Sequence, residues 1–287
     1  IQPDMESDVD SGNSSFRKSL STVIIVDGII DERLEPLSDY IPNSLIPINN
    51  SSILETLLTT LINENFERII IYATAGYFLI KQFCLEKFST YPIELYHGSY
   101  WNDLSCMYKD FCEFGLLDDI GTFLLMPVDF YCDQSLMSLY KEHLSLLRFY
   151  QKSLVSIIFS ESNNSKFETS SQEIIYLKMK NGLVRCLKSH YRDNNYIRVL
   201  NFDVIICNMD YLNKFSNYNQ KSMKTALLPS FHKTNFDFEE FAFRPKILFD
   251  RIALRLTPSI GDILKTSLFL TSMNQVAFSK SYVKKFQ

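Results

Sequence analysis

Glycine is scarce in this sequence: 8 of the 287 residues are glycine, which is less than half of the roughly 7% found in average proteins. Loops that hold phosphate groups depend on glycine, because a residue without a side chain lets the backbone approach the ligand closely. The chain therefore offers little material for a glycine-rich phosphate loop.

Paired cysteines, long apolar runs and a strong net charge are also lacking. The six cysteines show no Cys-x-x-Cys spacing, which predicts reduced core thiols rather than a zinc site or a disulfide framework. No apolar run approaches the roughly 20 residues that cross a bilayer. The formal net charge of −4 gives no overall basic field for nucleic acid. We expect a cytoplasmic protein that contacts neither membrane nor nucleic acid directly.

The first half of the chain alternates short apolar runs with segments of helical spacing. Residues 1–19 are rich in Asp, Ser and Asn and are predicted to be disordered. The predicted strands then cover 23–26, 69–72, 93–96 and 122–126, and the predicted helices cover 51–62, 77–88, 102–114 and 133–148, the last with Leu136, Leu139, Leu144 and Leu147 facing inward. This alternation predicts an α/β fold with a doubly wound, Rossmann-like, mostly parallel mixed sheet.

The second half is richer in strands. Apolar runs predict strands over 154–159, 174–179, 183–187, 202–207 and 252–256, and Asn181-Gly182 predicts a tight hairpin between the second and third of these. Helices are predicted over 209–216, 220–232 and 261–285, and 234–246 shows no clear period. We expect one domain over residues 20–287, in which the later strands extend the same sheet.

Two segments near the N-terminus carry the first chemical motif. A strand ends at Asp27-Gly28, and it is followed by Arg33-Leu34, Pro36-Leu37 and the run Ile41 to Ile48. This order resembles the sugar-phosphate nucleotidyltransferases, whose pattern is G-x-G-T-R-L-x-P-L-T and then P-K-x-L-x-P. In that family the glycines admit the triphosphate and the lysine neutralises its charge.

The reactive positions of this motif are degenerate. Gly28 and Arg33 remain, but Asp31 stands at a glycine position and Asn43 stands at the lysine position. Carboxylates at this point would repel a polyanion. Gly28 on its own is more typical of a tight turn than of a phosphate loop.

Two later segments resemble the same family. Residues 123–129 resemble the family's strand end at which an aspartate holds Mg²⁺, and Asp129 occupies that position. We favour the interpretation that Asp129 caps the helix near 133, because one carboxylate is a weak Mg²⁺ site. Residues 201–207 resemble a strand that closes the sugar pocket, with the bulkier Phe202 and Asp203 at an Ala-Gly pair.

The four histidines, His97, His143, His190 and His232, have no partner at ligand spacing. We interpret them as surface or satisfied core residues, not as metal ligands.

Among degenerate members, the chain is most similar to the epsilon-subunit family of eukaryotic translation initiation factor 2B. The similarity rests on the first loop, on Tyr140 to His143, and on the segments 155–162 and 247–279. It implies a domain that is not an enzyme and has no cofactor, with residual binding of Mg²⁺ or a nucleotide as an open alternative. It also implies binding to the gamma subunit and the other subunits of the exchange factor, and to translation initiation factor 2. It also implies that the family's β-helix and its C-terminal helical-repeat exchange domain are absent. Asn217-Tyr218 is the nearest match to an Asn-Phe pair important for exchange in that family, and an ordinary surface turn is an equal alternative.

Two other interpretations remain open. One is a divergent but active sugar-1-phosphate nucleotidyltransferase, which Gly28, Arg33 and Asp129 support. The other is the gamma-subunit family of the same factor, since Ala226 to Pro229 resembles one of its helices.

Overall fold

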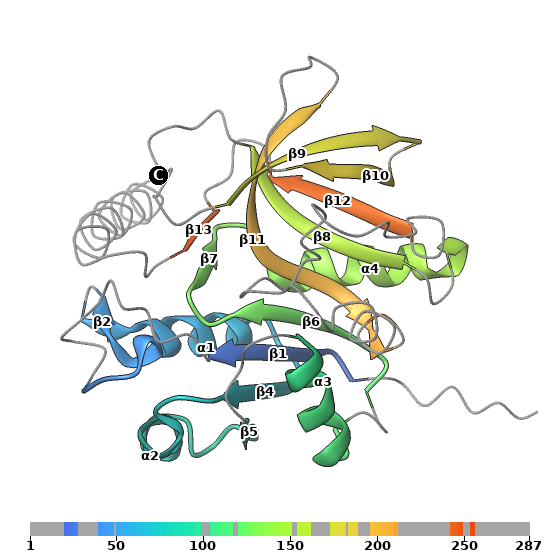
Figure 1. Ribbon diagram of the computed structural model, residues 1–287. Helices are drawn as coiled ribbons and strands as arrows, with labels where there is room; N and C mark the ends of the chain where they lie inside the picture. The colour runs from blue at the N-terminus through green and yellow to red at the C-terminus, as the bar shows by residue number, and fades with distance from the viewer. Residues whose placement is uncertain are drawn as a thin grey trace, which may run out of the picture.

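A mixed β-sheet of nine strands forms the centre of the described structure. The computed structural model describes residues 20–27, 40–48, 50–98, 104–116, 120–150, 154–161, 173–181, 183–188, 196–209, 211, 242–248 and 253–255. Four parallel strands lie side by side in the lower half of Figure 1, in the order β6 (Thr122–Pro127), β1 (Thr22–Asp27), β4 (Arg68–Ala73) and β5 (Ile93–His97). Every residue of β1 and β6 is buried, as expected for strands covered on both faces.

The remaining strands extend this sheet from β6. The long strand β11 (Ile197–Asn208) runs antiparallel to β6, and its first half pairs with the hairpin of β9 (Glu173–Lys180) and β10 (Leu183–Lys188). The strand β8 (Leu154–Glu161) pairs with β11 and with β12 (Ala242–Leu248). Four short strands form two small ladders outside the main sheet: β2 (Pro47–Ile48) with β3 (Ser51–Ser52), and β7 (Phe130–Cys132) with β13 (Ala253–Arg255).

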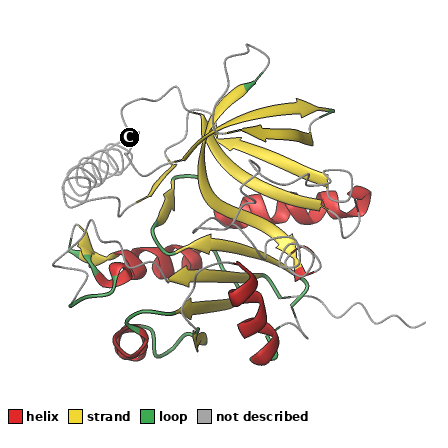
Figure 2. Ribbon diagram, in the orientation of Figure 1, coloured by secondary structure: helices red, strands yellow, loops and turns green. Residues whose placement is uncertain are grey.

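Helices cover both faces of the sheet (Figure 2). The helix α3 (Leu104–Glu113) buries Met107 and Phe111 on one face. The opposite face is covered by α1 (Ile53–Asn63), α2 (Tyr77–Lys87) and α4 (Leu136–Tyr150). The side chain of Ser52 caps α1 by accepting a hydrogen bond from the Glu55 amide at 3.0 Å. Each face therefore has its own apolar core, and the sheet separates the two cores.

The predicted α/β fold with a mixed sheet is confirmed, and so is the hairpin at Asn181. Four details of the prediction are wrong. The segment 234–246, expected to be irregular, contains the start of β12; β11 begins five residues before the predicted strand at 202; and β13 pairs outside the main sheet. Leu144, expected to face inward, is 37% exposed.

Several predicted segments lie outside the described residues: 1–19, nearly all of 209–232, and the helix over 261–285. Within the described part of the chain, no helix is long and apolar enough to cross a membrane.

Candidate functional site

Two aspartates meet where the parallel strands β1 and β6 end. Asp27 is the last residue of β1, and Asp129 follows β6 by two residues. The strands are in register, with Val26 opposite Pro127, and the Val128 amide donates a hydrogen bond to the Val26 carbonyl at 3.0 Å. From β1 the chain continues to β4 on one side, while β6 lies on the other, so this edge is the topological switch point at which open α/β sheets bind ligands.

The Asp27 carboxyl is buried without full compensation. Only 6% of Asp27 is exposed, and its Oδ2 atom accepts no hydrogen bond from the described residues. The pKa of Asp27 is raised from 3.8 to about 6, mainly by burial and in smaller part by the charge of Asp129. The Ser44 hydroxyl lies near the Asp27 carboxyl and partly opposes the rise of its pKa. The two groups do not form a hydrogen bond of normal geometry. A group that binds carboxylate oxygens would relieve this cost.

Asp129 does not cap the following helix, so our favoured interpretation of this residue is wrong. The helix α4 begins at Leu136, and the Ser135 hydroxyl accepts a hydrogen bond from the Ser138 amide at 3.1 Å in the manner of a cap. Asp129 instead sits, 7% exposed, in the turn between β6 and β7. The physical reason is distance along the chain, because Asp129 lies six positions before Ser135, the residue that caps α4.

The segment that resembles the lysine motif lies beside this edge. Asn43 opens a short 3-10 helix, η3 (Asn43–Leu45), which places the buried Ser44 near Asp27. Pro42 packs against the backbone of Gly76, and a Cβ added to Gly76 would lie 2.1 Å from the proline ring. Gly76 has φ +66°, which a glycine adopts without strain, and it precedes α2. This contact fixes the Asn43 turn against the start of α2.

A bulge in β11 holds the third motif. The register of β11 with β8 shifts between Asn201 and Val204. Phe202 is fully buried and its ring lies 5.4 Å from that of Phe130. Asp203 has φ +58°, and its carboxylate accepts a hydrogen bond from the Asn201 side chain at 2.9 Å. The side chain of Phe202 thus fills core space next to Phe130, the residue that follows Asp129.

The other predicted site residues are not placed here. Gly28, Asp31, Arg33, Asn217 and Tyr218 all lie outside the described residues. Asp27, which is described, was not among the predicted site residues. The signal that could have found it is the rule that ligands bind at the carboxyl ends of strands at a switch point.

A metal ion fits the pair of carboxylates. No group of three or more His, Cys, Asp or Glu side chains gathers among the described residues, so Asp27 and Asp129 would be the protein's described contribution. Mg²⁺ is commonly held by one or two carboxylates together with phosphate oxygens of a substrate.

Solved structures share this fold, although the sequence matches no protein-family model and no curated protein matches it. HddC from Yersinia pseudotuberculosis, complexed with GMP-PN, has a TM-score of 0.60 at 15% identity, over 88% of this chain and 100% of that one. A putative glucose-1-phosphate thymidylyltransferase from Bacillus anthracis, in complex with a sucrose, reaches 0.65 at 9% identity, over 87% and 95%. The inositol-1-phosphate CTP transferase from T. maritima reaches 0.59 at 10% identity, over 86% and 93%. These likenesses show a nucleotidyltransferase-like fold.

The prediction that the chain is not an enzyme is corrected by these structures. Two of the three are named as transferases, and each is matched over nearly its whole length. None of the three carries a name that refers to translation. We predicted a protein that is not an enzyme because the glycines of the first motif are replaced. The sequence pattern shows those replacements, but it does not show that Asp27 lies beside Asp129.

Proposed function

We propose that this protein is a nucleotidyltransferase that transfers the nucleoside monophosphate group of a nucleoside triphosphate to the phosphate of a phosphorylated sugar or polyol. The observation that supports this most directly is the pair of buried carboxylates, Asp27 and Asp129, at the switch point of a nucleotidyltransferase-like sheet. In such a reaction a phosphate oxygen of the acceptor attacks the α-phosphorus of the nucleotide, and pyrophosphate leaves.

Asp27 and Asp129 would hold Mg²⁺ in this proposal. The ion, when bound, would neutralise charge that develops on the α-phosphate. Asn43 carries no positive charge, so we expect slower turnover than a lysine at that position would allow.

The test is product formation by the purified chain. Each of the four nucleoside triphosphates is incubated with Mg²⁺ and a panel of hexose 1-phosphates and inositol 1-phosphate, and pyrophosphate release is measured together with the nucleotide product. We expect at least one pair to react, and Asp129→Asn or Asp27→Asn to slow that reaction about 100-fold or more by loss of charge stabilisation. Asp133→Asn removes an exposed carboxylate nearby and serves as the matched control. If no pair gives product above the Asp129→Asn background, the proposal fails.

The predicted partners remain a separate proposal. We propose that α2 and β5 form a surface for a second protein, with the gamma subunit of translation initiation factor 2B as the predicted candidate. Phe78, Leu79 and Leu85 on α2 are 76%, 47% and 64% exposed, and β5 is the last strand in the order of the described sheet. Co-expression and co-purification with that subunit, compared between the wild type and Phe78→Asp, would test it. The cytoplasmic location stays a prediction.

A further inference from the structure

Basic residues are concentrated in one part of an acidic chain. Between residues 173 and 200 the acidic residues are Glu173 and Asp193, and the basic residues are Lys178, Lys180, Arg185, Lys188, Arg192 and Arg198. The whole chain has a net charge of −4. The hairpin β9–β10 and the first part of β11 therefore carry a local positive charge that the overall composition hides.

The strand register places three cations and two tyrosines on one face of this region. Arg198 is opposite Tyr176, and Ile197 is opposite Leu177, so Tyr196 comes opposite Lys178. Leu177 and Val199 point into the apolar core on the other side of the sheet. Side chains alternate along a strand, so the side chains that share the face away from this core are those of Tyr176, Lys178, Lys180, Tyr196 and Arg198. We call these five residues the basic hairpin face.

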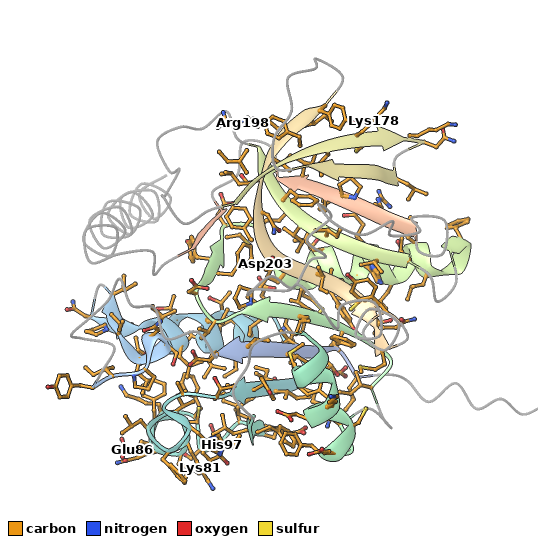
Figure 3. The ribbon with its side chains drawn as sticks, viewed as in Figure 1. Lys81, Glu86, His97, Lys178, Arg198 and Asp203 are labelled. Atoms are coloured by element: carbon orange, nitrogen blue, oxygen red, sulfur yellow. The ribbon has the colours of Figure 1, made fainter. Side chains whose placement is uncertain are left out.

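This face is open to solvent. Lys178, Lys180 and Arg198 are exposed, and the two tyrosines are half-buried. The Lys178 Nζ atom lies 6.0 Å from the centroid of the Tyr196 ring, within the range of a cation–π contact. Figure 3 shows Lys178 and Arg198 at the end of the sheet that lies farthest from Lys81 and Glu86 on α2. The hairpin pairs with Ile197–Asn201 of β11, whereas β6, which leads to Asp129, pairs with Ile205–Asn208 of the same strand.

From this arrangement we infer that the basic hairpin face binds single-stranded nucleic acid. Its three cations suit backbone phosphates, and Tyr176 and Tyr196 add aromatic faces on which bases stack. An acidic protein segment would use the cations but leave the tyrosines without a role, and a duplex keeps its bases stacked on one another. The inference departs from the sequence-based expectation of no nucleic-acid contact, which considered only the net charge.

The negative charge of the rest of the chain limits the affinity and makes it depend on salt. For single strands the slope of log affinity against log salt is about −0.7 for each phosphate neutralised, so three contacts predict a fall of roughly 20-fold between 50 and 200 mM salt.

The test is a fluorescence anisotropy titration of the full chain against a labelled 15-nucleotide oligo(U). The expected result is saturable binding at 50 mM salt, with the salt dependence given above. Lys178→Glu/Lys180→Glu should weaken binding about tenfold or more and flatten the salt dependence to roughly threefold, because two phosphate contacts are lost. Tyr176→Leu should weaken binding with the salt dependence unchanged, since it removes stacking and no charge.

Lys81→Glu is the matched control. Lys81 also lies over a tyrosine, 5.9 Å from the centroid of the Tyr77 ring, so this variant makes on α2 the charge change that each single substitution makes in the hairpin double variant, and it breaks the same kind of contact. The affinity of Lys81→Glu for oligo(U) should stay within about twofold of the wild-type affinity, and this limit includes the small loss due to the lower net charge. A 15-base-pair duplex and a polyglutamate peptide are titrated in parallel.

Three results would overturn the inference. One is the absence of binding to oligo(U) at 50 mM salt. Another is an equal loss of binding in Lys81→Glu and in the hairpin double variant, which would indicate a non-specific charge effect. The third is that polyglutamate or the duplex binds more tightly than the single strand, and that the hairpin variants weaken the binding of this tighter ligand as well as that of oligo(U). Asp129→Asn should bind oligo(U) like the wild type, which separates this result from that of the transferase assay.

Discussion

Asp27 is held in a state that its environment disfavours. Its carboxyl is buried next to a second carboxyl, and burial is the larger cause of its raised pKa. A fold selected for stability alone would place an apolar or amide side chain there. Residues with such unfavourable environments concentrate at sites that bind or react, which agrees with the proposed role.

The first prediction concerns the stability cost of Asp27. Because the folded-state pKa of about 6 lies above the unfolded value of 3.8, the contribution of this group to stability is fully present below pH 3.8 and is lost as the pH rises through 6. Asp27→Asn should therefore stabilise the fold at pH 7.5, by up to about 3 kcal/mol. Urea unfolding at pH 7.5 and pH 4 measures this, and the gain should disappear at pH 4. Asp133→Asn should show no such pH-dependent gain. A destabilised Asp27→Asn at pH 7.5 would contradict the argument.

The second prediction concerns the backbone at Asp203. Left-handed backbone costs a residue with a side chain about 1–2 kcal/mol, and the observed φ is +58°. Aspartate offsets part of this cost by its hydrogen bonds with Asn201. We expect Asp203→Ala to lower the free energy of unfolding by about 1–2 kcal/mol, and Asp203→Gly to recover most of that loss. Thermal and urea unfolding of the two variants decides this: equal stability of Ala and Gly would mean that the bulge relaxes at no cost.

At the scale of elements, buried strands and amphipathic helices are predictable from the sequence, while edge strands are not. The strands β1, β4 and β6 are continuous apolar runs, so their burial is visible in the residues themselves. The strand β12 contains Pro245 between Arg244 and Lys246 and pairs only with β8 among the described strands. Proline and charged side chains are tolerated at a sheet edge, and this composition hides the strand from a periodicity argument.

The packing of α4 against β8 and β12 is a tertiary feature of the same kind. His143 on α4 is 1% exposed, and its Nδ1 atom lies 2.8 Å from the Ser156 hydroxyl of β8. Glu142 bridges to Arg244 at 3.5 Å and to Lys246 at 2.6 Å. The histidine was predicted to be a surface or satisfied core residue, but its partner comes from a strand that only the fold brings near.

The third prediction follows from this packing. Burial, with a further effect of the Arg244 charge, lowers the pKa of His143 from 6.5 to about 4. Since the folded value is below the unfolded one, the stability is fully present above pH 6.5 and is lost as the pH falls towards 4. Relative to His143→Gln, the wild type should lose up to about 3 kcal/mol between pH 7 and pH 4. Chemical unfolding of both proteins across this range tests it, with His97→Gln as the control at an exposed histidine. Parallel curves for the wild type and His143→Gln would exclude the effect.

At the scale of the whole molecule, the candidate site is assembled from residues about one hundred positions apart. The sequence motif identifies Asp129, but the partner carboxylate is decided by the pairing of β1 with β6. A local pattern reports the loss of glycines and cannot report that pairing, because strand order is a property of the complete sheet. The same limitation applies to the basic hairpin face, whose residues come together only through the register of β9 and β11.

The last prediction couples the site to the stability of the whole fold. A divalent ion that binds only the folded protein stabilises it, and at 10 mM Mg²⁺ with a dissociation constant of about 1 mM the gain is about 1.4 kcal/mol. The ion competes with the proton on Asp27, whose pKa is about 6, so the gain should be present at pH 7.5 and much smaller at pH 5. Thermal unfolding with and without Mg²⁺ at the two pH values measures this without any substrate. Asp27→Asn and Asp129→Asn should abolish the gain, and Asp133→Asn should retain it. If Mg²⁺ stabilises Asp27→Asn as much as the wild type, the ion binds elsewhere and the metal is excluded from the proposed site. The transferase assay is a separate test and does not depend on this result.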